Sequence, residues 1–241
     1  MSRAPVDRQS RLEEFARRPN EQEANQRGLI TDLESAAIEA HVLKALNLTP
    51  ELRVLEAGCG TGLLASAIAG RVAHVVAGDI AFGFCQRARD KLEGRPGASI
   101  CQSDARCLPF ADNVFDRVLL YSVVLYLNER EFKAALGEFR RILRPTGWAF
   151  VGDVCNPYRY YHLCRSIRGL GRAASAAEWL KYVLRVSTYY VLSASPGHGW
   201  YTPGYFRRLA ESAGFEAEIL SQEPDMPYQV WRYDAVLWPV S

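Results

Sequence analysis

Three glycines at alternate positions, Gly58, Gly60 and Gly62, follow a short apolar stretch and precede a run of helix-forming residues. Glycine lets the backbone turn sharply from a strand into a helix, and it lets a ligand approach where any Cβ atom would collide. Glu56 lies just before the first glycine, and a carboxylate there disfavours phosphates but suits a ligand that carries a cation. The segment therefore predicts a binding turn for a small molecule with a positive charge. The alternative is a tight turn that binds nothing.

Acidic and polar side chains stand where later strands are expected to end. Asp79 lies 17 residues after Gly62, and a carboxylate at the end of the second strand can accept hydrogen bonds from both hydroxyls of a ribose. Asp104, Tyr121 and Asp153 fall at the ends of three further strands, at the sheet edge where ligands bind. Two alternatives remain open, namely that Asp79 caps the following helix and that Asp104 is a turn residue.

The elements that must position these residues alternate between strands and helices. The pattern predicts strands at 53–57, 74–79, 98–102, 115–121 and 148–153 and helices at 31–46, 63–69, 82–92 and 129–143. Such alternation builds βαβ units and a parallel sheet. A helix at 205–213 and an antiparallel pair of strands at 215–220 and 233–240 are expected to complete the chain.

The composition is that of an ordinary soluble globular protein. The 241 residues are 49% apolar and 23% charged, with a net charge of +2, and such a chain can bury a core without a disulfide or a metal. Six scattered cysteines show no zinc-ligand spacing, so we expect no metal site. No apolar run approaches the roughly 18 residues of a membrane span, and the low net charge exerts no strong pull on nucleic acid. We therefore expect a cytoplasmic protein that neither spans a membrane nor binds nucleic acid.

Taken together, the motifs resemble those of the class I S-adenosylmethionine-dependent methyltransferases. The matching segments are residues 56–62, Asp79, residues 103–110, residues 115–118 and residues 141–147. The resemblance implies an α/β fold with a seven-stranded, mostly parallel sheet and helices on both faces. It also implies S-adenosylmethionine as cofactor and S-adenosylhomocysteine as product. Residues 1–29 would form a helical, flexible N-terminal segment, and residues 30–241 the methyltransferase domain with a helical insertion at about 155–205.

The same resemblance implies roles for the glycine-rich loop. Gly58, Cys59, Gly60 and Gly62 would pass under the methionine and the ribose of the cofactor. Glu56 would lie near the amino group of the methionine. The loop would thus form the floor of the cofactor pocket.

Residues at the ends of the later strands would bind the rest of the cofactor. By the resemblance, Asp79 would hold the ribose hydroxyls and Ile80 would pack on the adenine ring. Asp104 would accept a hydrogen bond from the adenine amine, and the backbone amide of Ala105 would contact a ring nitrogen. Tyr121 would offer its backbone carbonyl to the methionine amino group.

Residues 155–205 interrupt the alternation and differ from the rest of the chain in charge. They contain six Lys and Arg residues against one Glu, a local charge of +5, together with many aromatic rings. An insertion at this point would stand over the carboxyl edge of the sheet. We expect a lid for an anionic or aromatic part of the substrate, which Tyr158, Arg159, His162 and Arg165 would contact. The alternative is a solvated helical face with its aromatic rings packed on the sheet.

Candidate catalytic residues are few. In-line methyl transfer mainly needs alignment and the exclusion of water, so a general base is optional. His198 and Asp153 are the candidates best placed to reach a methyl acceptor. Many relatives carry His or Gln near the exit of the fourth strand, where this chain has apolar Leu125. At that position the chain therefore offers no polar side chain to orient a substrate.

The expected function is O-methylation of a small molecule by a monomer or homodimer. A sugar-containing compound, a polysaccharide precursor or a secondary metabolite is the expected acceptor. Methylation of RNA, a nucleotide or a protein is the first alternative, because the basic segment could contact such a substrate. A non-catalytic regulatory protein that only binds the cofactor is the second.

Overall fold

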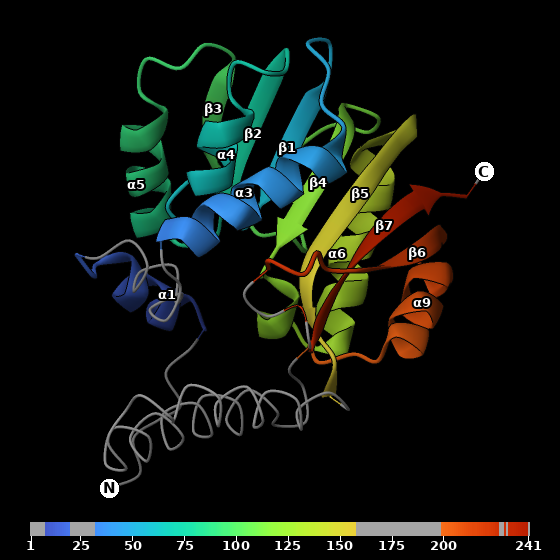
Figure 1. Cartoon of the computed structure of the whole chain (residues 1–241). Helices are drawn as coiled ribbons and strands as arrows, with labels where there is room; N and C mark the ends of the chain where they lie inside the picture. The colour runs from blue at the N-terminus through green and yellow to red at the C-terminus, as the bar shows by residue number, and fades with distance from the viewer. Residues whose placement is uncertain (1–7, 20–31, 158–198, 227–228, 230, 241) are drawn as a thin grey trace, which may run out of the picture.

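A seven-stranded sheet forms the centre of the molecule (Figure 1). The computed structural model describes residues 8–19, 32–157, 199–226, 229 and 231–240. Its strands are β1 (Arg53–Ala57), β2 (His74–Asp79), β3 (Ala98–Gln102), β4 (Phe115–Tyr121), β5 (Leu143–Cys155), β6 (Phe215–Ser221) and β7 (Arg232–Pro239). Its helices are α1 (Arg8–Ala16), α3 (Asp32–Leu46), α4 (Leu63–Ile68), α5 (Phe82–Leu92), the 3₁₀-helix η1 (Val124–Tyr126), α6 (Glu129–Ile142) and α9 (Pro203–Ser212).

The strand order is β3-β2-β1-β4-β5-β7-β6. β1 to β5 pair in parallel, whereas β7 runs antiparallel to both β5 and β6. The chain moves outward from β1 in one direction to β2 and in the other to β4, and ligands of such sheets bind at this switch point. The predicted α/β fold with a mostly parallel seven-stranded sheet is confirmed.

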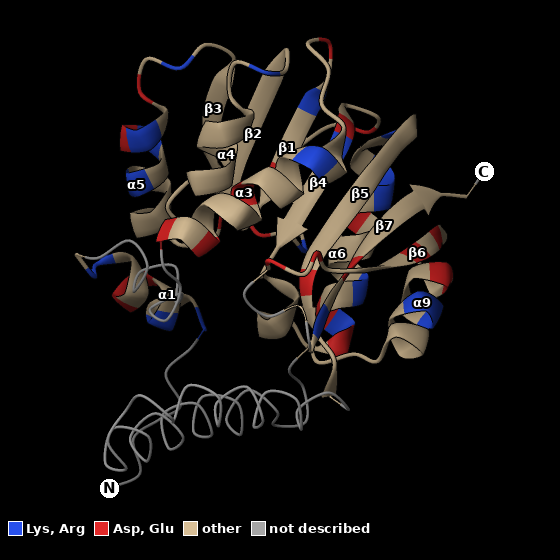
Figure 2. Cartoon of the chain, viewed as in Figure 1, with Lys and Arg blue, Asp and Glu red and all other residues tan. Residues whose placement is uncertain are grey.

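Helices cover both faces of the sheet. On one face Val42 of α3 shares a core cluster with Leu119 of β4. On the other face Phe139 of α6 and Phe206 of α9 share a cluster with Leu120 of β4. Because successive strand residues point to opposite faces, two neighbours in β4 belong to different cores. Figure 2 shows the charged residues mostly on helices and loops, with β2 and β5 largely free of them.

The N-terminal helix α1 packs against α5. Glu13 accepts hydrogen bonds from the backbone amides of Phe82 at 2.6 Å and Gly83 at 3.0 Å, and it thereby caps a helix whose own N-cap residue provides no side-chain cap. In return, Arg87 Nη1 donates to the carbonyl oxygen of Ala16 at 3.3 Å. These contacts hold α1 more closely than its polar sequence predicts.

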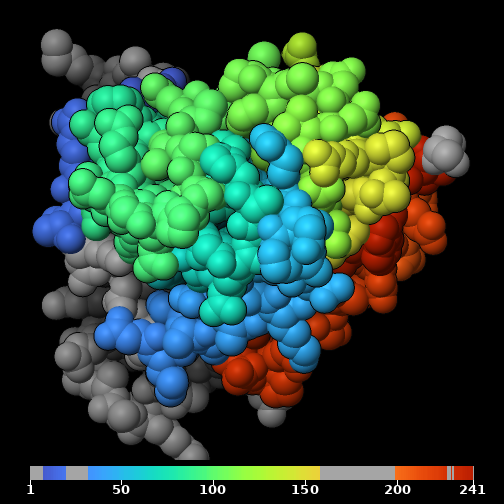
Figure 3. Space-filling model, turned by 90° about the horizontal axis from the view of Figure 1, so that it is seen from above, coloured from blue at the N-terminus to red at the C-terminus, as the bar shows by residue number. Residues whose placement is uncertain are grey.

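The segment that follows β6 lies beside α3, as Figure 3 shows from above. Met226 belongs to the same core cluster as Val42 and Leu46. Lys44 Nζ also donates to Glu223 Oε1 at 2.9 Å on the surface. The C-terminal part of the chain thus closes the face that α3 covers.

One strand is longer than predicted, and most of the expected insertion cannot be compared with the structure. β5 begins at Leu143 rather than near residue 148, because Leu143 already pairs with Phe115 before a register shift between Phe115 and Arg117. Most of the expected insertion at 155–205 lies outside the described residues. Within the described part of the chain, no helix is long and apolar enough to cross a membrane.

Candidate cofactor and acceptor site

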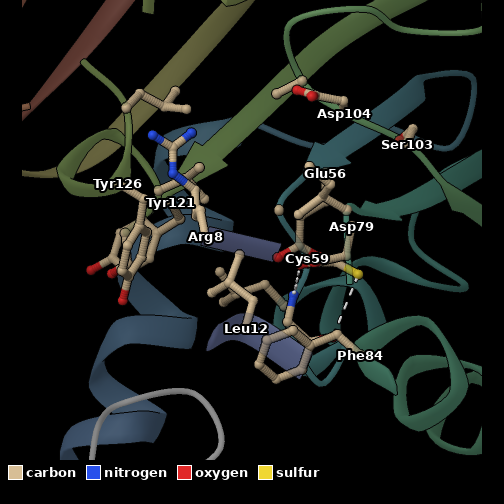
Figure 4. Close-up of a pocket in the computed structure, with 18 of the residues that line it drawn as sticks. Arg8, Leu12, Glu56, Cys59, Asp79, Phe84, Ser103, Asp104, Tyr121 and Tyr126 are labelled. Carbon is tan, nitrogen blue, oxygen red and sulfur yellow. Dashed lines mark hydrogen bonds between the residues drawn. The ribbon is translucent and has the colours of Figure 1, made fainter. Parts of the chain in front are cut away.

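A pocket lies at the carboxyl ends of β1 to β4 (Figure 4). Nine of the ten predicted cofactor residues line it, namely Glu56, Gly58, Cys59, Gly60, Asp79, Ile80, Asp104, Ala105 and Tyr121. Further lining residues that the sequence did not single out include Arg8 and Leu12 of α1, Phe84 of α5, and Ser122, Val123 and Tyr126 after β4. The strand ends therefore bring the predicted residues together, and α1 adds a wall that the sequence did not reveal.

The glycine-rich loop adopts backbone conformations that favour glycine. Gly58, Gly60 and Gly62 have φ angles of 81°, 53° and 80°, a region that residues with a Cβ atom rarely adopt. The amide of Gly58 donates to the carbonyl oxygen of Gly78 at 2.7 Å, which ties the loop to β2. A Cβ atom on Gly58 would lie 2.4 Å from Val123 Cγ2. The loop therefore needs glycine both for its turn and for its approach to the segment after β4.

Gly62 serves packing rather than the pocket wall. It is the N-cap residue of α4 and does not appear among the lining residues of the pocket. A Cβ atom on Gly62 would lie 2.9 Å from both Cα and Cβ of Ala88 in α5. The absence of a side chain lets α4 approach α5 closely.

Asp79 presents a buried carboxylate to the pocket. Its Oδ2 accepts from the amide of Gly60 and its Oδ1 from the amide of Ala81, both at 2.9 Å. Burial raises the pKa of Asp79 to about 6, although hydrogen bonds from the backbone amides of Ala81, Gly60 and Ile80 lower it. A carboxylate has about four lone-pair sites, so Asp79 keeps acceptor capacity for a ligand hydroxyl. Glu13, rather than Asp79, accepts from the amides of the first turn of α5, whereas Asp79 accepts from Ala81 just before that helix.

Two carboxylates make one end of the pocket electronegative. Glu56 is 3% exposed and Asp79 is 6% exposed. The pKa of the neighbouring Cys59 thiol is well above its ordinary value, first because of burial and then because of the charges of Glu56 and Asp79. A ligand with a positive charge would relieve the repulsion between these groups.

Asp104 is bound by Arg106 within the same turn. Arg106 Nε lies 2.9 Å from both carboxylate oxygens, and the Arg106 amide donates to Oδ1 at 2.9 Å. Burial raises the pKa of Asp104, but the hydrogen bonds and charge of Arg106 outweigh it and lower the pKa. Both residues line the pocket. Asp104 is therefore a turn residue as well as a pocket residue, and a ligand would share it with Arg106.

A network of ion pairs fastens α1 across the pocket. The two terminal nitrogens of Arg8 donate to the two carboxylate oxygens of Glu131 at 3.0 and 2.6 Å. Arg106 Nη1 donates to Glu131 Oε1 at 2.5 Å. Glu131 also forms a capping box with Asn128 at the start of α6. One carboxylate thus joins α1, α6 and the turn after β3.

The segment after β4 forms another wall of the pocket. Leu125, the position compared with polar residues of relatives, is 7% exposed and does not line the pocket. Ser122 and Tyr126 line the pocket instead, and Ser122 has a φ of 57°. This wall therefore carries two hydroxyl groups, which the identity of residue 125 alone could not predict.

Asp153 lies behind this wall. It is 6% exposed, and its Oδ2 accepts hydrogen bonds from the hydroxyl of Ser122 and from Nη1 of Arg232. Its amide donates to Asp234 Oδ1 at 2.8 Å. Because Asp153 is absent from the lining residues of the pocket, its influence on a bound acceptor must pass through Ser122.

The other predicted catalytic and substrate residues cannot be placed. His198, Tyr158, Arg159, His162 and Arg165 lie outside the described residues. Within the described ranges, no three His, Cys, Asp or Glu side chains gather in the way that metal ligands do.

Comparison with known proteins links this site to one family. Residues 54–147 match the family described as a methyltransferase domain. A demethylmenaquinone methyltransferase of Renibacterium salmoninarum is 34% identical over 116 residues, which are 48% of this chain and 47% of that protein. A malonyl-[acyl-carrier protein] O-methyltransferase of Geobacter sulfurreducens is 36% identical over 106 residues, 42% and 39% of the two chains. This chain therefore spans about half the length, or less, of these curated relatives.

Solved structures show the same fold at low sequence identity. Phosphoethanolamine N-methyltransferase 1 of Haemonchus contortus, in complex with phosphoethanolamine and S-adenosylhomocysteine, aligns with a TM-score of 0.67 and 18% identity. The alignment covers 98% of this chain and 50% of that one. The likeness concerns the fold alone. Together, the family match over residues 54–147 and the shared fold show a methyltransferase domain with the class I methyltransferase fold.

Proposed function

We propose that this protein transfers the methyl group of S-adenosylmethionine to an oxygen atom of a small molecule. The observation that carries the proposal is the pocket at the switch point of the sheet, which collects nine of the ten predicted cofactor residues. S-adenosylmethionine supplies a methyl group on a positively charged sulfur, which an aligned nucleophile displaces in line.

The chemistry of the pocket fits this cofactor. Asp79 offers buried lone pairs to ribose hydroxyls, and Glu56 offers a buried carboxylate to the amino group. A side chain at Gly58 would fill space against Val123, so the loop is shaped for close approach. Bound in this way, the cofactor would be held by hydrogen bonds at its ribose and by charge at its methionine end.

The protein's own task is then alignment and the exclusion of water. Arg8 and Leu12 of α1 cover part of the pocket, while Val123 and Leu127 give it apolar walls. Ser122 and Tyr126 add hydroxyls on the same side. Such a wall can hold an acceptor by shape and orient it through a few hydrogen bonds.

For the acceptor, we propose a sugar-containing compound, a polysaccharide precursor or a secondary metabolite. The names of the two curated relatives, one for demethylmenaquinone and one for a malonyl-acyl carrier, broaden the set worth testing. Both matches cover less than half of this chain. A reduced naphthoquinone and a malonyl thioester therefore belong in the same panel as sugar nucleotides.

The test combines binding and transfer. S-adenosylhomocysteine is titrated calorimetrically into the purified chain, and tritiated methyl transfer is followed with the panel, with total RNA, with protein and with a protein-free small-molecule extract of cells. Label in a small molecule supports the proposal. Label in RNA or protein contradicts the acceptor class, and binding without any transfer favours the regulatory alternative.

A further inference from the structure

We propose that the Ser122 hydroxyl oxygen accepts a hydrogen bond from the substrate that is methylated. We further propose that the buried side chains of Asp153, Arg232 and Asp234 behind the pocket fix the direction of this hydroxyl. The inference rests on the proposed function and specifies its acceptor side. It predicts that the substrate presents an O–H or N–H donor to the wall after β4.

Ser122 and Asp153 meet across two neighbouring strands in unusual backbone conformations. The Ser122 hydroxyl donates to Asp153 Oδ2, and the Ser122 amide donates to the carbonyl oxygen of Gly152 at 3.2 Å. Their φ angles are 57° and 66°, which cost energy for residues other than glycine. Strained residues of this kind cluster at functional sites. Here they bring one hydroxyl of the pocket wall onto one buried carboxylate.

Arg232 holds the carboxylate from the other side. Its Nη1 donates to the same oxygen of Asp153 that Ser122 contacts, and the two side chains are both 8% exposed. A carboxylate that is paired with a guanidinium acts only as a hydrogen-bond acceptor. The proton of Ser122 is therefore committed to Asp153, and the lone pairs of Ser122 Oγ are left for the pocket.

Asp234 fixes the backbone that carries Asp153. Its Oδ1 accepts from the Asp153 amide at 2.8 Å and from Gln222 Nε2 at 3.0 Å, and its Oδ2 lies 2.7 Å from His41 Nε2. Asp234 is fully buried. The pairing of β5 with β7 shifts register between Val151 and Val154, so this carboxylate fastens an irregular stretch of strand. Asp234 and Arg232 are positioning residues that act through Asp153.

The Asp153 carboxylate is already paired with Arg232 and does not require the Ser122 hydroxyl as a further partner. The pair already gives the carboxylate a charged partner, and the amide of Asp153 is bound by Asp234. Ser122, in contrast, is partly exposed and lines the pocket. The hydroxyl thus stands between a fixed acceptor and the space where a substrate would lie, beside apolar Val123.

Matched variants at Ser122 test the inference. Ser122→Ala removes the hydroxyl, and Ser122→Gly removes it while relieving the positive φ. With the protein-free small-molecule extract as the source of substrate, we expect the rate of methyl transfer at low extract concentration to fall about tenfold to hundredfold in both variants. The reason is that the O–H or N–H group of the substrate loses its hydrogen-bond partner. Their affinity for S-adenosylhomocysteine should equal that of the wild type. Ser99→Ala, in β3 and bonded to His74 at 2.8 Å, is the matched serine control and should retain full transfer.

Asp153→Asn tests the positioning role. Its amide group can donate to Ser122 and turn the hydroxyl proton into the pocket, so the extract concentration for half-maximal rate should rise while the affinity for S-adenosylhomocysteine is kept. If both Ser122 variants transfer methyl groups at the wild-type rate, the inference is overturned even if Asp153→Asn does not fold. A wild-type chain that labels nothing in the extract overturns the proposed function itself and this inference with it.

Discussion

Arg8 and Glu131 are joined by two hydrogen bonds of 3.0 and 2.6 Å across 123 residues of sequence. The contact links the first turn of α1 to the first turn of α6, and α1 contributes Arg8 and Leu12 to the pocket wall. This arrangement predicts that the ion pair slows the release of a ligand from the pocket.

We expect Arg8→Ala to speed the release of S-adenosylhomocysteine. The Arg8 and Glu131 side chains are 32% and 17% exposed, and loss of about 1 to 2 kcal/mol would raise the dissociation rate roughly fivefold to thirtyfold. Stopped-flow displacement measures the rate. Lys44→Ala removes an exposed ion pair with Glu223, neither of which lines the pocket, and should leave the rate unchanged. Equal rates for Arg8→Ala and wild type would show that α1 does not retain the ligand.

The affinity for S-adenosylhomocysteine should fall as the pH drops below about 6. Burial raises the pKa of Asp79 to about 6, and a protonated carboxyl loses acceptor capacity for ribose hydroxyls. Well below this value, the affinity should fall by up to about tenfold per pH unit, as expected for one linked proton. Calorimetric titrations between pH 5 and pH 8 measure the profile. Asp79→Asn should bind more weakly at pH 8 and show a flatter profile, whereas an unchanged slope would assign the effect to another group.

The raised pKa of Asp79 has the opposite effect on the pH dependence of stability without ligand: lower pH weakens binding but stabilises the fold. The folded state binds the proton of Asp79 more tightly than the unfolded chain, whose value is near 3.8. The contribution of Asp79 to folding is therefore greatest below pH 3.8 and is lost as the pH rises through about 6. Urea unfolding of wild type and Asp79→Asn at several pH values isolates this contribution. A difference between them that grows more favourable to the wild type with rising pH would contradict the assignment.

Two glycine substitutions should have opposite effects on stability. Gly58→Ala would place a Cβ atom 2.4 Å from Val123 Cγ2 at a φ of +81°, so we expect a loss of about 1 to 3 kcal/mol and weaker binding of S-adenosylhomocysteine. Gly137→Ala lies within α6, where an added Cβ atom meets nothing within 4 Å. It should raise the free energy of unfolding by about 0.5 to 1 kcal/mol. Chemical denaturation compares the two variants, and a neutral Gly58→Ala would show that the loop can rearrange.

The sheet and the cofactor side of the pocket could be predicted because their signals are local in sequence. Gly58 directly follows the apolar strand β1, and Asp79 is the last residue of β2. Each pocket residue is therefore next in sequence to the strand that positions it. Parallel strands then bring their carboxyl ends to one edge. Even there, the sequence could not separate Gly60, which lines the pocket, from Gly62, which packs on Ala88.

The remaining contacts could not be predicted because they join distant segments. Ser122 and Asp153 meet because β4 pairs with β5, with Tyr121 opposite Gly152. Arg232 lies 79 residues from Asp153, and no periodicity in either segment indicates the pairing. The place of α1 likewise depends on how Glu13 meets the backbone of α5. Each contact follows from tertiary packing, which local patterns do not encode.

Calorimetric titration of S-adenosylhomocysteine into the wild-type chain and into Asp79→Ala is the most direct test of the central claim that this pocket binds the cofactor. The buried carboxylate with two backbone hydrogen bonds predicts one binding site in the wild type and an affinity about tenfold to hundredfold lower in the variant. Absence of binding to the wild type, or equal affinity for the two folded proteins, would contradict the claim.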